Sequence, residues 1–186
     1  MRRYLPLLIT LGLAWGQNKV NVNNLFKHRN KYFKENDYFP YDGVVFDISK
    51  ETRNKILQFR MLNGIKNGTY KEWYANGKPK TTGGYFNDDS TESWTKWYES
   101  GRKQSEKNYR NGKEWGLRIL YHDNGIIKYK NANFKKNGDD KTYLIFTRYD
   151  EYGKLIEGDK TWWDGFDIKS GECYKDNEKV DCYAPY

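Results

Sequence analysis

A period of 24 residues runs through the middle of the chain and constrains the fold more than any other feature. Glycines at 77, 101 and 125 stand 24 residues apart, and a looser copy ends at Gly153. A second series with the same spacing contains Asn63-Gly64, Asn87-Asp88 and Asn111-Gly112, and continues loosely at Asn137-Gly138. A third series consists of Gly68, Glu92 and Gly116. Three series that share one period indicate a structural repeat.

Each repeat carries two turn signals, and this predicts one β-hairpin per repeat. Asn-Gly between short runs of Tyr, Trp and Thr is the strongest local hairpin signal, because both central residues of the turn need a positive φ. We therefore predict an all-β fold, an elongated twisted antiparallel sheet of consecutive hairpins with a small C-terminal cap. About ten strands, spaced ~4.8 Å apart, would make this sheet about 50 Å long. The glycines expected at its turns are Gly64, Gly77, Gly101, Gly112, Gly125, Gly138 and Gly153.

The alternation of side chains along each strand places two aromatic columns on opposite faces of this sheet. One column consists of Trp73, Trp97 and Tyr121, and the other of Tyr74, Tyr98 and His122. A sheet of one layer cannot bury both faces, so one column is expected to stay accessible. We predict that the first column is the binding face and keep the second as the alternative. His122 stands where the other copies carry Tyr, which favours packing over catalysis.

The segment from Gly68 to Lys78 and the turn from Tyr109 to Lys113 resemble the MORN-type repeat. The closest likeness is to the variant found in bacterial exported and antitoxin-labelled proteins. The resemblance covers residues 41–158, and departs from the pattern at Glu92, where Gly is expected, and at Asp88, where the turn Gly is expected. It implies a twisted sheet of hairpins that binds or scaffolds proteins or lipid head groups, with no catalysis by the repeats.

The segments that flank the repeats have different compositions. Residues 1–16 combine a basic start, an apolar run and small residues, which predicts a signal peptide cleaved before Gln17 and a secreted or periplasmic protein. Residues 17–40 are basic and rich in Asn, and are expected to form a short helix beginning near Asn24, or a loop. Residues 159–186 are acidic and are expected to form the cap. In an exported chain, Cys173 and Cys182 are expected to form a disulfide.

Charge is distributed unevenly along the chain. The whole sequence carries a net charge of +8, and loss of Arg2 and Arg3 with the signal peptide leaves +6. Residues 17–149 hold 26 basic and 15 acidic groups, a net of +11, whereas residues 150–186 hold 5 basic and 10 acidic groups, a net of −5. A basic repeat region favours an acidic partner.

No motif in the sequence predicts an enzyme. Nucleophile elbows, zinc-protease motifs and phosphate loops are absent, and Asp88-Asp89 and Asp139-Asp140 are adjacent residues that point to opposite faces. We expect no metal and no cofactor. The predicted function is an exported, non-enzymatic binding or scaffolding module for another macromolecule. A protein is the leading partner, lipid head groups or glycans stay open, and export disfavours nucleic acid. The alternatives are an immunity or antitoxin-like inhibitor of an acidic protein, and a carbohydrate-active or carbohydrate-binding protein that uses Trp162, Trp163 and the acidic tail.

Overall fold

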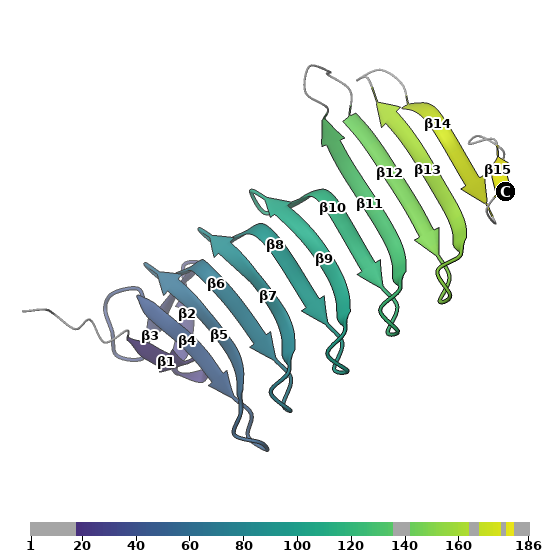
Figure 1. Cartoon of the computed structure of the whole chain (residues 1–186). Helices are drawn as coiled ribbons and strands as arrows, with labels where there is room; N and C mark the ends of the chain where they lie inside the picture. Colours follow the sequence, from purple (N-terminus) through teal and green to yellow (C-terminus); the bar gives the residue numbers. More distant parts are fainter. Residues whose placement is uncertain (1–17, 136–141, 164–167, 176–177, 181–186) are drawn as a thin grey trace, which may run out of the picture.

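The computed structural model describes residues 18–135, 142–163, 168–175 and 178–180, and it confirms the all-β prediction. Thirteen strands form one long sheet in the order β1-β4-β5-β6-β7-β8-β9-β10-β11-β12-β13-β14-β15, and β2 pairs with β3 in a second sheet (Figure 1). Every pair of neighbours in the long sheet is antiparallel except β1 with β4. The strands are β1 (Lys19–Asn21), β2 (Leu25–His28), β3 (Lys31–Lys34), β4 (Gly43–Ile48), β5 (Lys55–Leu62), β6 (Ile65–Trp73), β7 (Pro79–Phe86), β8 (Asp89–Trp97), β9 (Lys103–Arg110), β10 (Lys113–Tyr121), β11 (Ile127–Lys135), β12 (Thr142–Tyr149), β13 (Leu155–Trp163), β14 (Ile168–Lys175) and β15 (Glu178–Val180).

Tight two-residue turns close the hairpins at one edge of the long sheet. Both residues of Asn63-Gly64 and of Asn111-Gly112 have positive φ, at 51° and 76° and at 51° and 73°. These are the left-handed turns that the Asn-Gly pattern predicts. Asn87-Asp88 adopts the same geometry at 52° and 66°, and Glu92 keeps a φ of 58° where its counterparts are Gly68 and Gly116. The second hairpin therefore retains the repeat geometry without the expected glycines.

Longer loops close the hairpins at the opposite edge. In three of these loops the backbone N–H of Tyr74, Tyr98 or His122 donates to the carbonyl four residues later, as from Tyr74 to Lys78 at 2.9 Å. Glycine follows in the left-handed region, with φ of 84° at Gly77, 97° at Gly101 and 92° at Gly125. A register shift at each strand end, such as Glu72/Trp73, repeats with the same period. The local geometry thus follows the sequence repeat.

Strands β2 and β3, residues 25–34, form the amino-terminal hairpin, and the expected helix near Asn24 is limited to one 3₁₀ turn, η1 (Val22–Asn24). Strands β2 and β3 meet at Arg29 and Asn30, whose φ values of 45° and 64° make another left-handed turn. Leu25 and Tyr32 from this hairpin pack against a buried cluster in the first strands of the long sheet. The members of the cluster are Val20, Tyr41, Val45, Phe59 and Met61. The amino-terminal hairpin therefore covers one face of the sheet at its first strands.

Strand register divides the side chains of the long sheet between two faces, because residues directly opposite in neighbouring strands point the same way. The ladder face carries, from β4 to β12, Val45, Phe59, Tyr70, Gly83, Trp94, Lys107, Arg118, Asn131 and Phe146. The basic face carries Phe46, Gln58, Lys71, Thr82, Thr95, Glu106, Ile119, Lys130 and Thr147. The amino-terminal hairpin covers the ladder face.

Several predicted features fall outside the described residues. The signal peptide, Gly138, Asp139-Asp140 and Cys182 belong to this group, and the side chains of Trp162, Trp163 and Cys173 are outside the description although their strands are within it. The predicted disulfide therefore stays a prediction. Strands β14 and β15 continue the long sheet into the segment expected to form the cap. In the part of the chain that is described, no helix is long and apolar enough to span a membrane.

Candidate binding surface

The predicted binding column occupies equivalent positions at the ends of three strands on the basic face. Trp73, Trp97 and Tyr121 are the last residues of β6, β8 and β10, and each is half-buried. The ammonium of Lys55 lies 5.9 Å from the centre of the Trp73 ring. The Tyr121 hydroxyl donates to Glu106 Oε2, and burial, followed by this hydrogen bond and the charge of Glu106, raises the pKa of Tyr121 to about 12. These rings combine apolar area with charged neighbours.

The alternative column binds the backbone of the neighbouring repeat. The hydroxyl of Tyr74 donates to the Trp97 carbonyl at 2.7 Å, and the hydroxyl of Tyr98 donates to the Tyr121 carbonyl at the same distance. His122 Nε2 lies 3.1 Å from the Tyr149 carbonyl, so it takes the place of the Tyr hydroxyl. The polar groups of this column therefore hold consecutive repeats together at the loop edge.

The ladder face holds an aromatic cluster that the sequence interpretation missed. Phe59, Tyr70, Trp94 and Tyr109 lie in consecutive contact across the strands, with Tyr85 between them, and their ring centroids are 5.1–6.2 Å apart. The signal was present, because Tyr70 and Trp94 are 24 residues apart, as are Tyr85 and Tyr109. Tyr70 and Trp94 stand four residues before Tyr74 and Tyr98, so they lie away from the loop glycines that mark the predicted columns. This cluster continues the covered core along the sheet.

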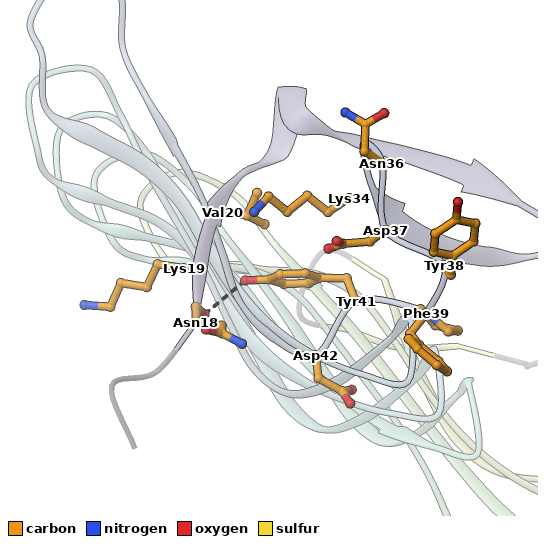
Figure 2. A pocket seen from close by; sticks show the side chains of 11 residues that line it. Asn18, Lys19, Val20, Lys34, Asn36, Asp37, Tyr38, Phe39, Tyr41 and Asp42 are labelled. Atoms are coloured by element: carbon orange, nitrogen blue, oxygen red, sulfur yellow. Dashed lines mark hydrogen bonds between the residues drawn. The ribbon is translucent and has the colours of Figure 1, made fainter. Parts of the chain in front are cut away.

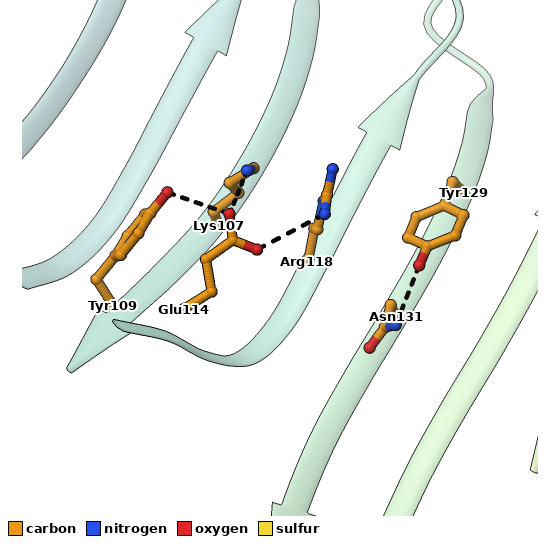
Figure 3. A network of polar contacts seen from close by, with 6 residues as sticks. All are labelled: Lys107, Tyr109, Glu114, Arg118, Tyr129 and Asn131. Carbon is orange, nitrogen blue, oxygen red and sulfur yellow. Dashed lines mark hydrogen bonds and ion pairs between the residues drawn. The ribbon is translucent and has the colours of Figure 1, made fainter. Parts of the chain in front are cut away.

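Three cations of the ladder face, Lys107, Arg118 and Arg148, form ion pairs with carboxylates. Figure 3 shows Glu114 between Lys107 and Arg118, with one oxygen bonded to the Lys107 ammonium and the other 3.7 Å from Arg118 Nη1. The Tyr109 hydroxyl also donates to Glu114, at 3.3 Å. The Lys107 hydrogen bond is the largest cause of a lowered pKa at Glu114. Arg148 and Glu157 make a further pair at 3.8 Å. Lys66 lies over the rings of Phe59, Tyr70 and Tyr85 on the same face. Among the described residues, neither Lys66 nor the exposed Lys96 of this face makes an ion pair, and the face therefore retains fewer uncompensated cations than the basic face.

The basic face carries cations that are largely uncompensated. From β1 to β12 of the long sheet, its cations in register positions are Lys19, Lys55, Arg60, Lys71, Lys103, Arg110, Lys113 and Lys130, and its carboxylates there are those of Asp89 and Glu106. Glu106 is occupied by Lys103 at 2.6 Å and by Tyr121. Among the described residues, Arg60, Lys71 and Lys113 make no ion pair. A positive potential is therefore expected over this face.

Apolar side chains on the basic face are unusually open to solvent. Phe86 is 64% exposed, Leu62 is 49% exposed and Trp115 is 46% exposed, and all three lie near the tight-turn edge. Leu117 lies beside them on β10 and is also exposed. The Arg110 guanidinium is 5.9 Å from the centre of the Trp115 ring. Exposed apolar groups among cations are typical of an interaction surface.

A separate hollow of about 460 Å³ lies beside the amino-terminal hairpin. Figure 2 shows Tyr41 pointing across it toward Asn18, whose carbonyl accepts the Tyr41 hydroxyl at 3.0 Å. Lys34, Asp37 and Asp42 contribute charges of both signs to its lining. Its mixed lining favours no single class of ligand.

The described residues contain no group of three or more His, Cys, Asp or Glu side chains that could hold a metal ion. Comparison of the chain with family models, with curated proteins and with solved structures found no match. The MORN-type resemblance therefore remains a prediction from the residues.

Proposed function

We propose that this chain is a non-enzymatic binding module that holds an acidic protein on the basic face of its sheet. The observation that carries the proposal is the coincidence, on one face, of uncompensated cations with exposed Phe86, Leu62 and Trp115. The ladder face lacks this combination, because three of its cations pair with carboxylates and the amino-terminal hairpin covers one end.

The two kinds of side chain have different roles in this proposal. Exposed cations accelerate encounter with an acidic partner and make affinity depend on salt, because exposed charges are screened beyond ~10 Å at 0.1 M salt. Apolar and aromatic groups slow dissociation, and truncation of such anchors typically costs ≥ ~2 kcal/mol of binding energy. Trp73, Trp97 and Tyr121 are half-buried and extend the same face toward the loop edge. An immunity-type inhibitor of an acidic protein is one form of this function.

Capture of a partner tests the proposal. The chain from residue 17 onward is immobilised, exposed to proteins of the exported fraction, and the affinity of each captured protein is measured by calorimetry. The basic-face variant Arg60→Glu/Lys71→Glu and the apolar variant Phe86→Ser are compared with Lys96→Glu, an exposed cation of the ladder face.

The proposal expects an acidic protein whose affinity falls in both basic-face variants and with added salt, while Lys96→Glu binds almost normally. A captured partner that is lost only with Lys96→Glu, or whose binding ignores salt and all three variants, would overturn the choice of the basic face. Turnover of a glycan panel by the chain would contradict the non-enzymatic function.

A further inference from the structure

The basic face contains a hollow of about 410 Å³ over its first strands. Val44, Phe46 and Ile48 of β4 supply its apolar lining. Cations surround these residues, with Lys19 from β1, Arg53 from the loop before β5, and Lys55 from the start of β5. The volume lies within the roughly 300–1,000 Å³ that is typical of ligand sites.

The charge of this hollow has one sign. Its lining contains no carboxylate, and among the described residues neither Lys19 nor Arg53 makes an ion pair. The Lys55 ammonium donates to Gln58 Oε1 at 2.8 Å, a bond that orients the side chain and leaves its charge uncompensated. Three cations beside an apolar lining suit a ligand that carries carboxylates next to an apolar group.

The loop that presents Arg53 is held in place by several hydrogen bonds. The Arg53 backbone N–H donates to the Ser49 carbonyl at 3.0 Å, and the φ of Arg53 is 60°, in the left-handed region. The Thr52 hydroxyl and the Asn54 amide both donate to the Ala75 carbonyl of the next loop, each at 2.8 Å. These bonds hold the backbone from which the Arg53 side chain projects.

Lys55 connects the hollow with the aromatic column. Its ammonium lines the hollow and also lies 5.9 Å from the centre of the Trp73 ring. A ligand segment seated in the hollow therefore has a continuous path toward Trp73 and Trp97 along the same face.

We infer that this hollow is the specificity pocket for the partner, and that it takes an acidic peptide segment with an apolar side chain between carboxylates. The apolar side chain contacts Phe46 and its neighbours, and the carboxylates meet Lys19, Arg53 and Lys55. The inference rests on the proposed function and narrows it to a sequence class of partner.

Fluorescence anisotropy tests the pocket directly. The probe is a short fluorescein-labelled peptide with a central Phe-Leu pair between Asp and Glu residues, and a second probe replaces Phe-Leu with Ser-Ser. The pocket variant is Lys19→Gln/Arg53→Gln, both exposed side chains, and the matched control with the same charge change is Lys50→Gln/Lys96→Gln. Sodium dodecanoate serves as a competitor with the same chemistry from a lipid source.

The native chain is expected to bind the Phe-Leu probe more tightly than the Ser-Ser probe. The pocket variant is expected to lose about tenfold in affinity for the Phe-Leu probe, as two lost charge pairs at partly exposed sites would give. The control variant is expected to change little. A Phe46→Ser variant should reduce the preference for Phe-Leu, provided that its circular dichroism matches that of the native chain.

Each other outcome overturns the inference. Equal losses in the pocket and control variants would show non-specific charge attraction, and equal binding of the two probes would refute the apolar lining. Absence of probe binding would refute the sequence class, and dodecanoate that binds more tightly than the probe would assign the hollow to a lipid carboxylate. The capture experiment uses no probe, so the proposed function stands or fails independently of these results.

Discussion

Replacing Gly83 with Ala is expected to disrupt the aromatic cluster on the ladder face. A Cβ atom at Gly83 would lie within 2.6 Å of three ring atoms of Trp94, much closer than carbon atoms can approach. The indole therefore lies directly on the glycine backbone. The φ of Gly83 is outside the left-handed range, so the substitution introduces no backbone strain, and the effect comes from the collision alone.

The structure sets the size of this effect. Inserting a methyl group into a well-packed site costs about 1–3 kcal/mol. An indole that moves away instead loses its contacts with Tyr70, Tyr85 and Tyr109, whose centroids are 5.4, 5.1 and 6.2 Å distant. Such pairs contribute about 0.5–1.5 kcal/mol each. Replacing Gly with Ala also stabilises the fold by about 0.4–1 kcal/mol, because Ala lowers the conformational entropy of the unfolded chain. We therefore expect the free energy of unfolding to fall by about 2 kcal/mol.

Urea unfolding followed by tryptophan fluorescence measures this loss. The matched control is Gly84→Ala, because a Cβ there would meet its nearest atoms in Thr91 at an ordinary 3.7 Å. The control is expected to be unchanged or slightly stabilised. In a Trp94→Leu background, Gly83→Ala should lose most of its effect, since the colliding ring is gone. Equal stability of the Gly83 and Gly84 variants, or an undiminished loss without Trp94, would refute the reasoning.

Three further predictions concern the repeat geometry and its pH dependence. Tyr98→Phe should lower the free energy of unfolding by about 1 kcal/mol in urea titrations, because the Tyr121 carbonyl loses its partner; an unchanged midpoint would contradict that role. Glu92→Gly should raise the free energy of unfolding by up to ~1 kcal/mol, because a left-handed φ strains Glu and not Gly. A lower free energy of unfolding in this variant would contradict the strain at Glu92. The pKa of Tyr121 is raised from its ordinary 10.0 to about 12. Since the folded state holds that proton more tightly, the stabilisation is complete below pH ~10 and disappears as the pH rises toward 12. Tyr121→Phe should therefore weaken the alkaline loss of stability measured by urea titration at several pH values, and an identical pH profile would refute the assignment.

The turns could be predicted from sequence because their chemistry is local. Asn63-Gly64 and Asn111-Gly112 need only the φ preferences of their own residues. Asp88 shows why departures from the pattern are tolerated. Its carboxylate accepts the Lys66 N–H at 2.7 Å, and its own N–H donates to the Lys66 carbonyl at 2.9 Å. Contacts with the preceding repeat thus stabilise a conformation that Asp alone rarely adopts.

The amino-terminal hairpin and the ladder face could not be predicted in the same way. Arg29-Asn30 forms a left-handed turn without Gly, so residues 18–40 carry no hairpin signal of the usual kind. The neighbours Trp94 and Thr95 occupy opposite faces, and the alternation of side chains does not indicate which of the two faces is covered. The covered face is decided by Leu25 and Tyr32, which lie far from the repeats in sequence. Long-range packing therefore determines which aromatic residues become core.

Equivalent positions of the repeats show how one backbone carries two different surfaces. On the ladder face, Arg118 occupies the position that Tyr70 and Trp94 hold in the two preceding repeats. Glu114 compensates the charge of Arg118 within the same strand. On the basic face, the position of Lys71 becomes Thr95 and then Ile119, and these changes require no compensating charge, because that face is open. Turn residues fix the backbone in every repeat, so substitutions between the turns can alter a surface at little cost to the fold. The covered face restricts such substitutions through packing, whereas the open face leaves them free to define what the protein binds.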